Sequence, residues 1–228
     1  MIEGSPILSF SREKLKRMDN QVRKSTVTGR TFDGYCKMLN ISADSLKDKK
    51  ILDIGAGNSK FADTAVNYGA DVTNLDARYS SDSVDSSGKL NKVKAYMQHL
   101  PFKNDSFNCS LALYSLNWLG TSGDVRKSLA EMIRVTEGQI KISPVYLRFG
   151  LENKEAFDER FKKEPVNLKT CNIPPYETFY QLDIYVDKSI RRNWQNIVAK
   201  LVSHLDFNLE ARAQKAWMAL KRIQKPSY

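Results

Sequence analysis

The chain has 228 residues, 41% of them hydrophobic, which is enough apolar surface for a folded core and excludes a wholly disordered protein. The sequence contains no apolar run long enough to cross a membrane, and the charges near its start do not follow the order of a secretory leader. Three widely spaced cysteines argue against a disulfide framework or a zinc cluster and favour a reducing, cytoplasmic compartment. The formal net charge of +10 is concentrated in residues 1–50 and 188–228, so these ends either contact an anionic partner or are simply well solvated.

The first 48 residues have the pattern of two helices. Ser11 and Thr31 are residue types that begin helices, and apolar residues follow each of them at helical spacing. In the second helix, Tyr35, Met38 and Leu39 are expected to face inward.

Residues 49–77 have the pattern of a strand, a helix and a second strand. The apolar run Ile51–Ile54 is typical of a buried parallel strand, and it leads into the glycine turn Gly55–Gly57. The second strand ends at Asp76. Open α/β sheets bind their ligands at this carboxyl edge, beside such a turn.

This unit predicts a nucleoside site. Glycines let the backbone approach a ligand closely, and the helix that follows offers unpaired N–H groups. Asp76, 19 positions after Gly57, is placed to accept hydrogen bonds from both ribose hydroxyls. Lys60 stands where a dinucleotide site would have its third glycine, so a pyrophosphate ligand is disfavoured without being excluded. A plain strand–helix connection with no ligand is the remaining alternative.

Two sequence blocks carry a family resemblance. The segment Asp53–Ser59 (DIGAGNS) resembles motif I of the class I S-adenosylmethionine (SAM)-dependent methyltransferases. Leu100–Phe102, followed by Asp105–Phe107 and an apolar strand, resembles the ubiquinone/menaquinone C-methyltransferase-like group, methyltransferase type 11. The resemblance covers residues 51–145 and implies the class I methyltransferase fold, an α/β, Rossmann-like, doubly wound and mostly parallel sheet.

The resemblance also implies where SAM binds. Asp53 would help to anchor the methionine end and Asp76 would bind the ribose, while the N-terminal helices would form a lid from which Arg23, Arg30 and Tyr35 could reach the donor's carboxylate. The further residues implied in cofactor binding are Gly55, Ala56, Gly57, Asn58, Ala77, Met97, Gln98 and Tyr114. Asn117 and Tyr146 are expected to line the acceptor side. No catalytic base and no metal ligand is assigned.

Three positions depart from the family's pattern. Tyr96 replaces an acid that contacts adenine, so Met97 and Gln98 are expected to hold that base instead. Asn108 replaces an aspartate, and Asn117 replaces a histidine near the end of the fourth strand. These changes leave the SAM-binding prediction intact but put a general base at this position in doubt.

Beyond the second block we expect a helix over 124–135, a break at Gly138 and a strand over 139–145. A charged helix is expected over 154–164. Strands over 166–170 and 178–186 would resemble the family's closing antiparallel pair. The serine-rich segment 79–88 is expected to form a loop.

Segments 194–205 and 209–223 have apolar residues at helical spacing and predict a basic helical hairpin. It could pack on the sheet, dimerise, bind RNA or lie on an anionic membrane.

The sequence therefore predicts one structural domain in three parts: a helical lid (1–48), a SAM-binding α/β core (49–187) and a basic helical extension (188–228). Three hypotheses for its function follow. The first is a methyltransferase acting on a small-molecule acceptor, the second is a methyltransferase acting on RNA or another macromolecule through the basic ends, and the third is a non-catalytic SAM-binding protein. The acceptor and the oligomeric state are left open.

Overall fold

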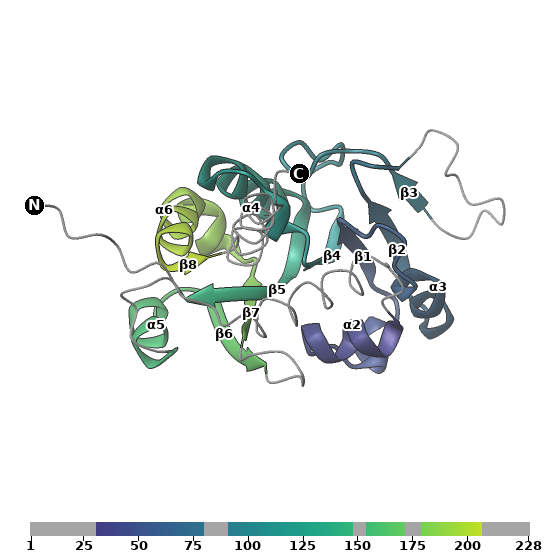
Figure 1. Cartoon of the computed structure of the whole chain (residues 1–228), viewed down its shortest axis with the longest axis horizontal. Coiled ribbons are helices and arrows are strands. Elements are labelled where there is room, and N and C mark those ends of the chain that lie inside the picture. Colours follow the sequence, from purple (N-terminus) through teal and green to yellow (C-terminus); the bar gives the residue numbers. More distant parts are fainter. Residues whose placement is uncertain (1–30, 80–90, 148–153, 172–178, 207–228) are drawn as a thin grey trace, which may run out of the picture.

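The structure is a computed structural model, and it describes residues 31–79, 91–147, 154–171 and 179–206. These residues form one mixed sheet with the strand order β3-β2-β1-β4-β5-β7-β6 and with helices on both faces (Figure 1). Neighbouring strands from β3 to β5 pair in parallel, and β7 runs antiparallel to both β5 and β6. The expected doubly wound, mostly parallel α/β fold is confirmed, together with its closing antiparallel pair.

The strands are β1 (Lys50–Ile54), β2 (Asp71–Leu75), β3 (Asn91–Val93), β4 (Phe107–Leu113), β5 (Thr136–Leu147), β6 (Val166–Cys171), β7 (Phe179–Tyr185) and β8 (Leu205–Asp206). The α-helices are α2 (Phe32–Leu39), α3 (Phe61–Ala65), α4 (Ser122–Val135), α5 (Lys154–Phe161) and α6 (Lys188–His204). Short 3₁₀ turns are η1 (Ala43–Leu46), η2 (Val66–Tyr68) and η3 (Leu116–Trp118).

Helices α2 and α3 cover one face of the sheet, called the α2 face below. Thr31 begins α2 as predicted, because its hydroxyl accepts a hydrogen bond from the backbone N–H of Gly34 at 3.2 Å. The ring of Phe61 on α3 stacks on Phe32 and Tyr35 of α2, with centroids 5.6 and 4.9 Å apart. These aromatic contacts fix α2 beside the glycine turn that precedes α3.

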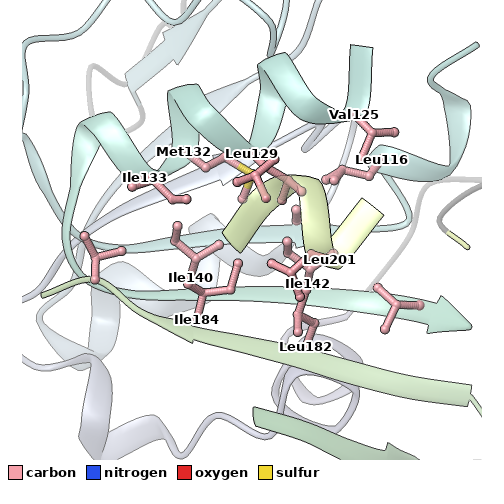
Figure 2. Close-up of a cluster of buried hydrophobic side chains, with 14 of the residues drawn as sticks. Leu116, Val125, Leu129, Met132, Ile133, Ile140, Ile142, Leu182, Ile184 and Leu201 are labelled. Carbon is pink, nitrogen blue, oxygen red and sulfur yellow. The ribbon is translucent and has the colours of Figure 1, made fainter. Parts of the chain in front are cut away.

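Helices α4, α5 and α6 cover the other face. Figure 2 shows the apolar side chains of α4, among them Leu129 and Met132, lying against Ile142 of β5 and Leu182 of β7. Leu201 of α6 joins the same buried cluster. The predicted helix at the start of the basic C-terminal segment therefore packs on its own sheet, because its apolar side is part of the core.

Two element boundaries differ from the prediction. Helix α4 passes directly into β5, so Gly138 lies inside a strand and does not break a helix. A Cβ on Gly138 would lie 2.3 Å from the carbonyl oxygen of Asn108, so this position needs glycine where β4 and β5 shift register. Leu205 belongs to β8, which pairs with β5, whereas its spacing predicted that it would continue the helix.

Several predicted features lie outside the described residues. They are the helix beginning at Ser11, the side chains of Arg23 and Arg30, the loop from residue 80 onward and the helix over 209–223. Within the ranges that the structure describes, no helix has the length and apolar character needed to span a membrane.

Candidate functional site

The glycine turn after β1 is held between two other segments. The N–H groups of Gly55 and Ala56 both donate to the carbonyl oxygen of Leu75 at the end of β2, at 2.7 and 3.1 Å. Gly55 and Gly57 have left-handed φ angles of 71° and 55°. A Cβ on Gly55 would lie 2.4 Å from the Cβ of Ser115, just beyond β4. The turn thus requires glycine both for its backbone conformation and for this close approach.

Asp76 connects the end of β2 to the glycine turn. Its side chain is buried, and Oδ2 accepts a hydrogen bond from the N–H of Gly57 at 3.0 Å. Oδ1 accepts from the N–H of Arg78 at 2.8 Å and from the Nε of the same residue at 3.2 Å. Ala77, between these partners, is partly buried. The carboxylate is therefore fixed where the sequence motif predicted a ribose-binding acid.

Tyr79 supports the turn from the other side. Its hydroxyl donates to the carbonyl oxygen of Gly57 at 2.8 Å. Burial, together with the carboxylates of Asp53 and Asp76, raises the pKa of this phenol, so it stays protonated and keeps its role as a donor. The sequence analysis missed Tyr79, for which the only available signal was an aromatic residue three positions after the ribose-binding acid.

Asp53 lies on β1 with no exposed surface. The hydroxyl of Tyr35 on α2 donates to its Oδ1 at 3.4 Å, so the N-terminal helix reaches the motif directly. In the sheet, Asp53 is the register partner of Leu111 on β4, Leu111 pairs with Lys141 on β5, and Lys141 pairs with Asp183 on β7. We call these four positions the polar row.

The end of β4 carries the residues predicted for the methyl and acceptor side. Tyr114 has a left-handed φ of 59°, an unusual conformation for a non-glycine residue, and its N–H donates to the carbonyl oxygen of Ser143 on β5 at 2.7 Å. Asn117 follows in η3 and is buried. Tyr146 lies further along β5 and pairs with Asp206 of β8. Tyr114 is thus held next to Ser115, which contacts the glycine turn, and is bonded to β5.

The predicted adenine side is held by helix α4. Met97 and Gln98 are partly buried in the segment before Leu100. The N–H of Leu100 donates to Glu131 Oε2 at 2.8 Å, and Arg134 donates to the carbonyl oxygens of Leu100 and Phe102 at 2.9 and 2.7 Å. Hydrogen bonding from the guanidinium of Arg134 lowers the pKa of Glu131.

Glu131 and Arg134 were also missed by the sequence analysis, because two charges three residues apart on a helix are ordinary surface features.

Asn108 lies at the opposite, amino edge of the sheet. Its Oδ1 accepts from the N–H of Lys50 at 2.8 Å, and its Nδ2 donates to Glu137 Oε1 at 2.6 Å. This side chain joins the first residues of β1 and β5 to β4, so its departure from the family's aspartate is far from the glycine turn. Among the residues with described positions, no group of three or more His, Cys, Asp or Glu side chains is arranged to hold a metal ion.

Residues 52–139 match the family model of the methyltransferase domain, type 11. This part of the chain, which is less than half of its length, is similar to a methyltransferase domain. The match begins on β1 and ends early in β5, so it contains the glycine turn, Asp76 and the end of β4. No curated protein sequence matches the chain significantly.

Two solved structures are similar to the chain at low sequence identity. The 1,6-didemethyltoxoflavin-N1-methyltransferase of Burkholderia thailandensis is 14% identical with a TM-score of 0.52, and the match covers 81% of this chain and 93% of that one. The magnesium protoporphyrin IX methyltransferase of Synechocystis PCC 6803 is 9% identical with a TM-score of 0.47, covering 81% and 87% of the two chains. The Burkholderia structure shows that the sheet order and helical layers are those of the class I methyltransferase fold.

Proposed function

We propose that this domain transfers the methyl group of SAM to a small-molecule acceptor that approaches the carboxyl edge of β4 and β5. The observation that carries the proposal is the bond from the N–H of Gly57 to the buried carboxylate of Asp76. It brings the two parts of a nucleoside site, a glycine turn and a ribose-binding acid, into direct contact. Such preorganisation lowers the entropic cost of binding.

The donor would lie across β1, β2 and β4. Asp53 would help to anchor its methionine end, and the turn residues Gly55, Ala56, Gly57 and Asn58 would line its centre. Ala77, Met97 and Gln98 would flank the adenine, and Tyr114 would face the methyl group. SAM supplies a sulfonium methyl that is already activated, so the chain's own contribution is to align the two substrates and exclude water.

Methyl transfer needs no group from this chain beyond that alignment unless the acceptor must lose a proton. A bond from the methyl carbon to the acceptor atom forms while the carbon–sulfur bond breaks, and the electron pair of that bond stays on sulfur. A proton on the acceptor atom, where there is one, passes to solvent. Asn117 and Tyr146 are proposed as acceptor-lining residues and not as a base.

Arg78 must move for a ribose to bind Asp76. Its guanidinium contacts both carboxylate oxygens, but the side chain is 80% exposed and ends a flexible stem. Because the guanidinium itself is in solvent, little is lost when it moves away, and the two ribose hydroxyls can take its place on the carboxylate. The backbone donors Gly57 and Arg78 stay in place and keep the carboxylate oriented.

A small acceptor fits the described part of the basic C-terminal segment. Helix α6 uses its apolar side to cover the sheet, so that side is not available for a membrane or a second chain. The structurally similar Burkholderia enzyme is named for a small-molecule acceptor. An RNA acceptor, and SAM binding without turnover, are the outcomes that would replace this proposal.

Calorimetric titration with SAM and with S-adenosylhomocysteine tests the donor site. We expect both to bind the unchanged protein, and Asp76→Ala to weaken binding at least tenfold because the ribose hydroxyls lose their acceptor. Asp71→Ala is the matched control, since Asp71 is an exposed aspartate at the other end of the same strand. A folded protein that binds neither compound would contradict the proposal.

The class of acceptor can be tested with a labelled methyl donor. Small-molecule and RNA fractions of a cell extract are incubated separately with the protein, and label is expected in the small-molecule fraction. Labelled RNA, together with RNA binding that weakens steeply with salt, would support the macromolecular alternative. Binding of SAM with no label in either fraction would support a non-catalytic role.

A further inference from the structure

The α2 face of β5, β7 and β6 holds charged side chains in the sheet itself. Lys141 is almost fully buried, and its Nζ lies 3.4 Å from Asp183 Oδ1 and 3.4 Å from the carbonyl oxygen of Asn40, just beyond α2. Asp183 has no exposed surface and also pairs with Lys169, whose Nζ lies 2.8 Å from Oδ2. Each charged group of this cluster therefore has an oppositely charged partner within it.

Two buried polar groups lie next to this charged cluster. Gln181 has no exposed surface, and its Nε2 donates to Asp183 Oδ1. That bond fixes the orientation of the amide, because the reverse orientation would place two oxygens against each other. The oxygen Oε1 of Gln181 then remains without a hydrogen-bond donor in the described structure. The hydroxyl of Ser143, on a side chain only 1% exposed, also has no partner there.

The sheet register places these two groups at the edge where methyl transfer would occur. Ser143 pairs with Leu113, the last residue of β4, so it lies nearer the carboxyl edge of β5 than Lys141 does. Gln181 is two positions from Asp183 on the antiparallel strand β7, so it shares the face of Asp183 and lies toward the same edge. Asn117, whose Nδ2 is likewise buried without a described partner, follows β4 at this edge.

Buried polar atoms almost always find a hydrogen-bond partner, so several unsatisfied ones together need an explanation. On the opposite face of β5 and β7, Ile140, Ile142, Leu182 and Ile184 belong to a buried apolar cluster, so the unpaired polar groups of these strands are on the α2 face. A ligand that carries its own donor and acceptor would satisfy the atoms that the protein leaves unpaired.

We infer that the methyl acceptor is an uncharged molecule with an N–H group beside a C=O group, as in a lactam heterocycle, and that it binds at Gln181 and Ser143. The ligand's N–H would donate to Gln181 Oε1, and the hydroxyl of Ser143 would donate to the ligand's carbonyl oxygen. An uncharged ligand fits because each charged group of the cluster is already paired within the sheet. Asp183, bonded to two lysines and a glutamine, serves recognition and is not a base. The inference rests on the proposed function, since it places the acceptor of that reaction.

Binding of simple probes tests the inference. Uracil, hypoxanthine and 2-pyridone each carry the lactam edge, whereas purine and 2-methoxypyridine lack it. The full chain, saturated with S-adenosylhomocysteine, is titrated with each probe by calorimetry or ligand-observed NMR. At least one lactam probe is expected to bind, and the two controls are expected to bind at least tenfold more weakly.

Three variants identify the site. Gln181→Met and Ser143→Ala are each expected to weaken binding of the lactam probe at least tenfold. Their affinity for S-adenosylhomocysteine is expected to stay unchanged, which also shows that the variants are folded. Ser110→Ala is the matched control, because Ser110 is a buried serine on the neighbouring strand β4 whose hydroxyl already pairs with Thr136. It is expected to leave probe binding unchanged.

The outcomes separate the two proposals. Failure of the unchanged protein to bind S-adenosylhomocysteine would overturn the proposed function. If S-adenosylhomocysteine binds but no lactam probe does, or if probe binding survives both Gln181→Met and Ser143→Ala, the lactam site is wrong and the donor site stands.

Discussion

We call β1 and β2 the donor half of the sheet, and β5 and β7 the acceptor half. The buried polar groups of the two halves differ in how they are hydrogen-bonded. Around β1 and β2, the carboxylate of Asp76 is bonded to the N–H groups of Gly57 and Arg78, and Tyr79 is bonded to the glycine turn. Around β5 and β7, Ser143 and Gln181 keep buried atoms without a partner in the described structure. Buried atoms without a described partner also occur in the donor half, at Asn74 Oδ1 on β2 and Ser115 Oγ beside the glycine turn. The difference therefore lies in Asp76 and the turn, which several hydrogen bonds hold together, whereas Ser143 and Gln181 are the groups for which we propose a ligand.

The largest expected effect is a loss of stability on breaking the buried ion pair of the acceptor half, Lys141 with Asp183. Asp183→Ala would leave Lys141 buried without its carboxylate and should lower the free energy of unfolding by about 3–5 kcal/mol. Urea denaturation followed by circular dichroism measures this change. The double variant Lys141→Met, Asp183→Leu is the control, because it removes the buried pair together and should recover most of the loss. An Asp183→Ala protein as stable as the unchanged chain would show that the pair is not buried as described.

A smaller effect is expected at the glycine turn of the donor half. Gly55→Ala would place a Cβ 2.4 Å from the Cβ of Ser115 on a residue with a φ of 71°. The left-handed conformation alone costs a non-glycine residue about 1–2 kcal/mol, and the steric clash adds to it. The expected result is a loss of about 2–4 kcal/mol with little remaining SAM affinity, measured by denaturation and calorimetry. Gly120→Ala, where a Cβ would meet nothing within 4 Å, should change neither quantity.

The smallest effect concerns acid stability on the adenine side. The folded-state pKa of Glu131 is lowered by its bonds to Arg134 and Leu100, so this group stabilises the fold above its unfolded-state pKa. That contribution is lost as the pH falls from about 5 through the folded-state pKa. Glu131→Gln should therefore flatten the acid limb of a plot of melting temperature against pH, and it should change stability less at pH 4 than at pH 7. Glu155→Gln, at an exposed position on α5, is the control, and an identical acid limb in both variants would contradict the assignment.

The donor half was predictable from sequence because its geometry depends on the backbone. Glycines at Gly55 and Gly57 and an acid at Asp76 specify a turn and a strand end, and local spacing is enough to place them together. Short-range pattern also predicted the capping of α2 by Thr31, and the family resemblance predicted the mostly parallel sheet. The roles of the named donor residues in SAM binding stay predictions until binding is measured.

The acceptor half was not predictable, because its groups meet only through pairing of strands far apart in the sequence. Lys141 and Asp183 lie 42 positions apart, and nothing in either segment indicates that the other will be its partner. Lys50 and Asn108 form a similar long-range contact. The strand position of Gly138 was missed for the same reason, since the need for glycine there comes from the approach of β4 and not from a turn.

Leu111 separates the two charged sites of the polar row. Leu111 is on β4, between Asp53 on β1 and Lys141 on β5. The Cα atoms of Asp53 and Lys141 are therefore two strand spacings apart, about 10 Å. At an effective dielectric constant near 20, opposite charges at that separation attract by less than half of what a contact pair at about 4 Å would gain. One apolar position therefore insulates Asp53 from Lys141. Each of the two charges therefore depends mainly on its nearer partner, Tyr35 for Asp53 and Asp183 for Lys141, although both belong to the same sheet.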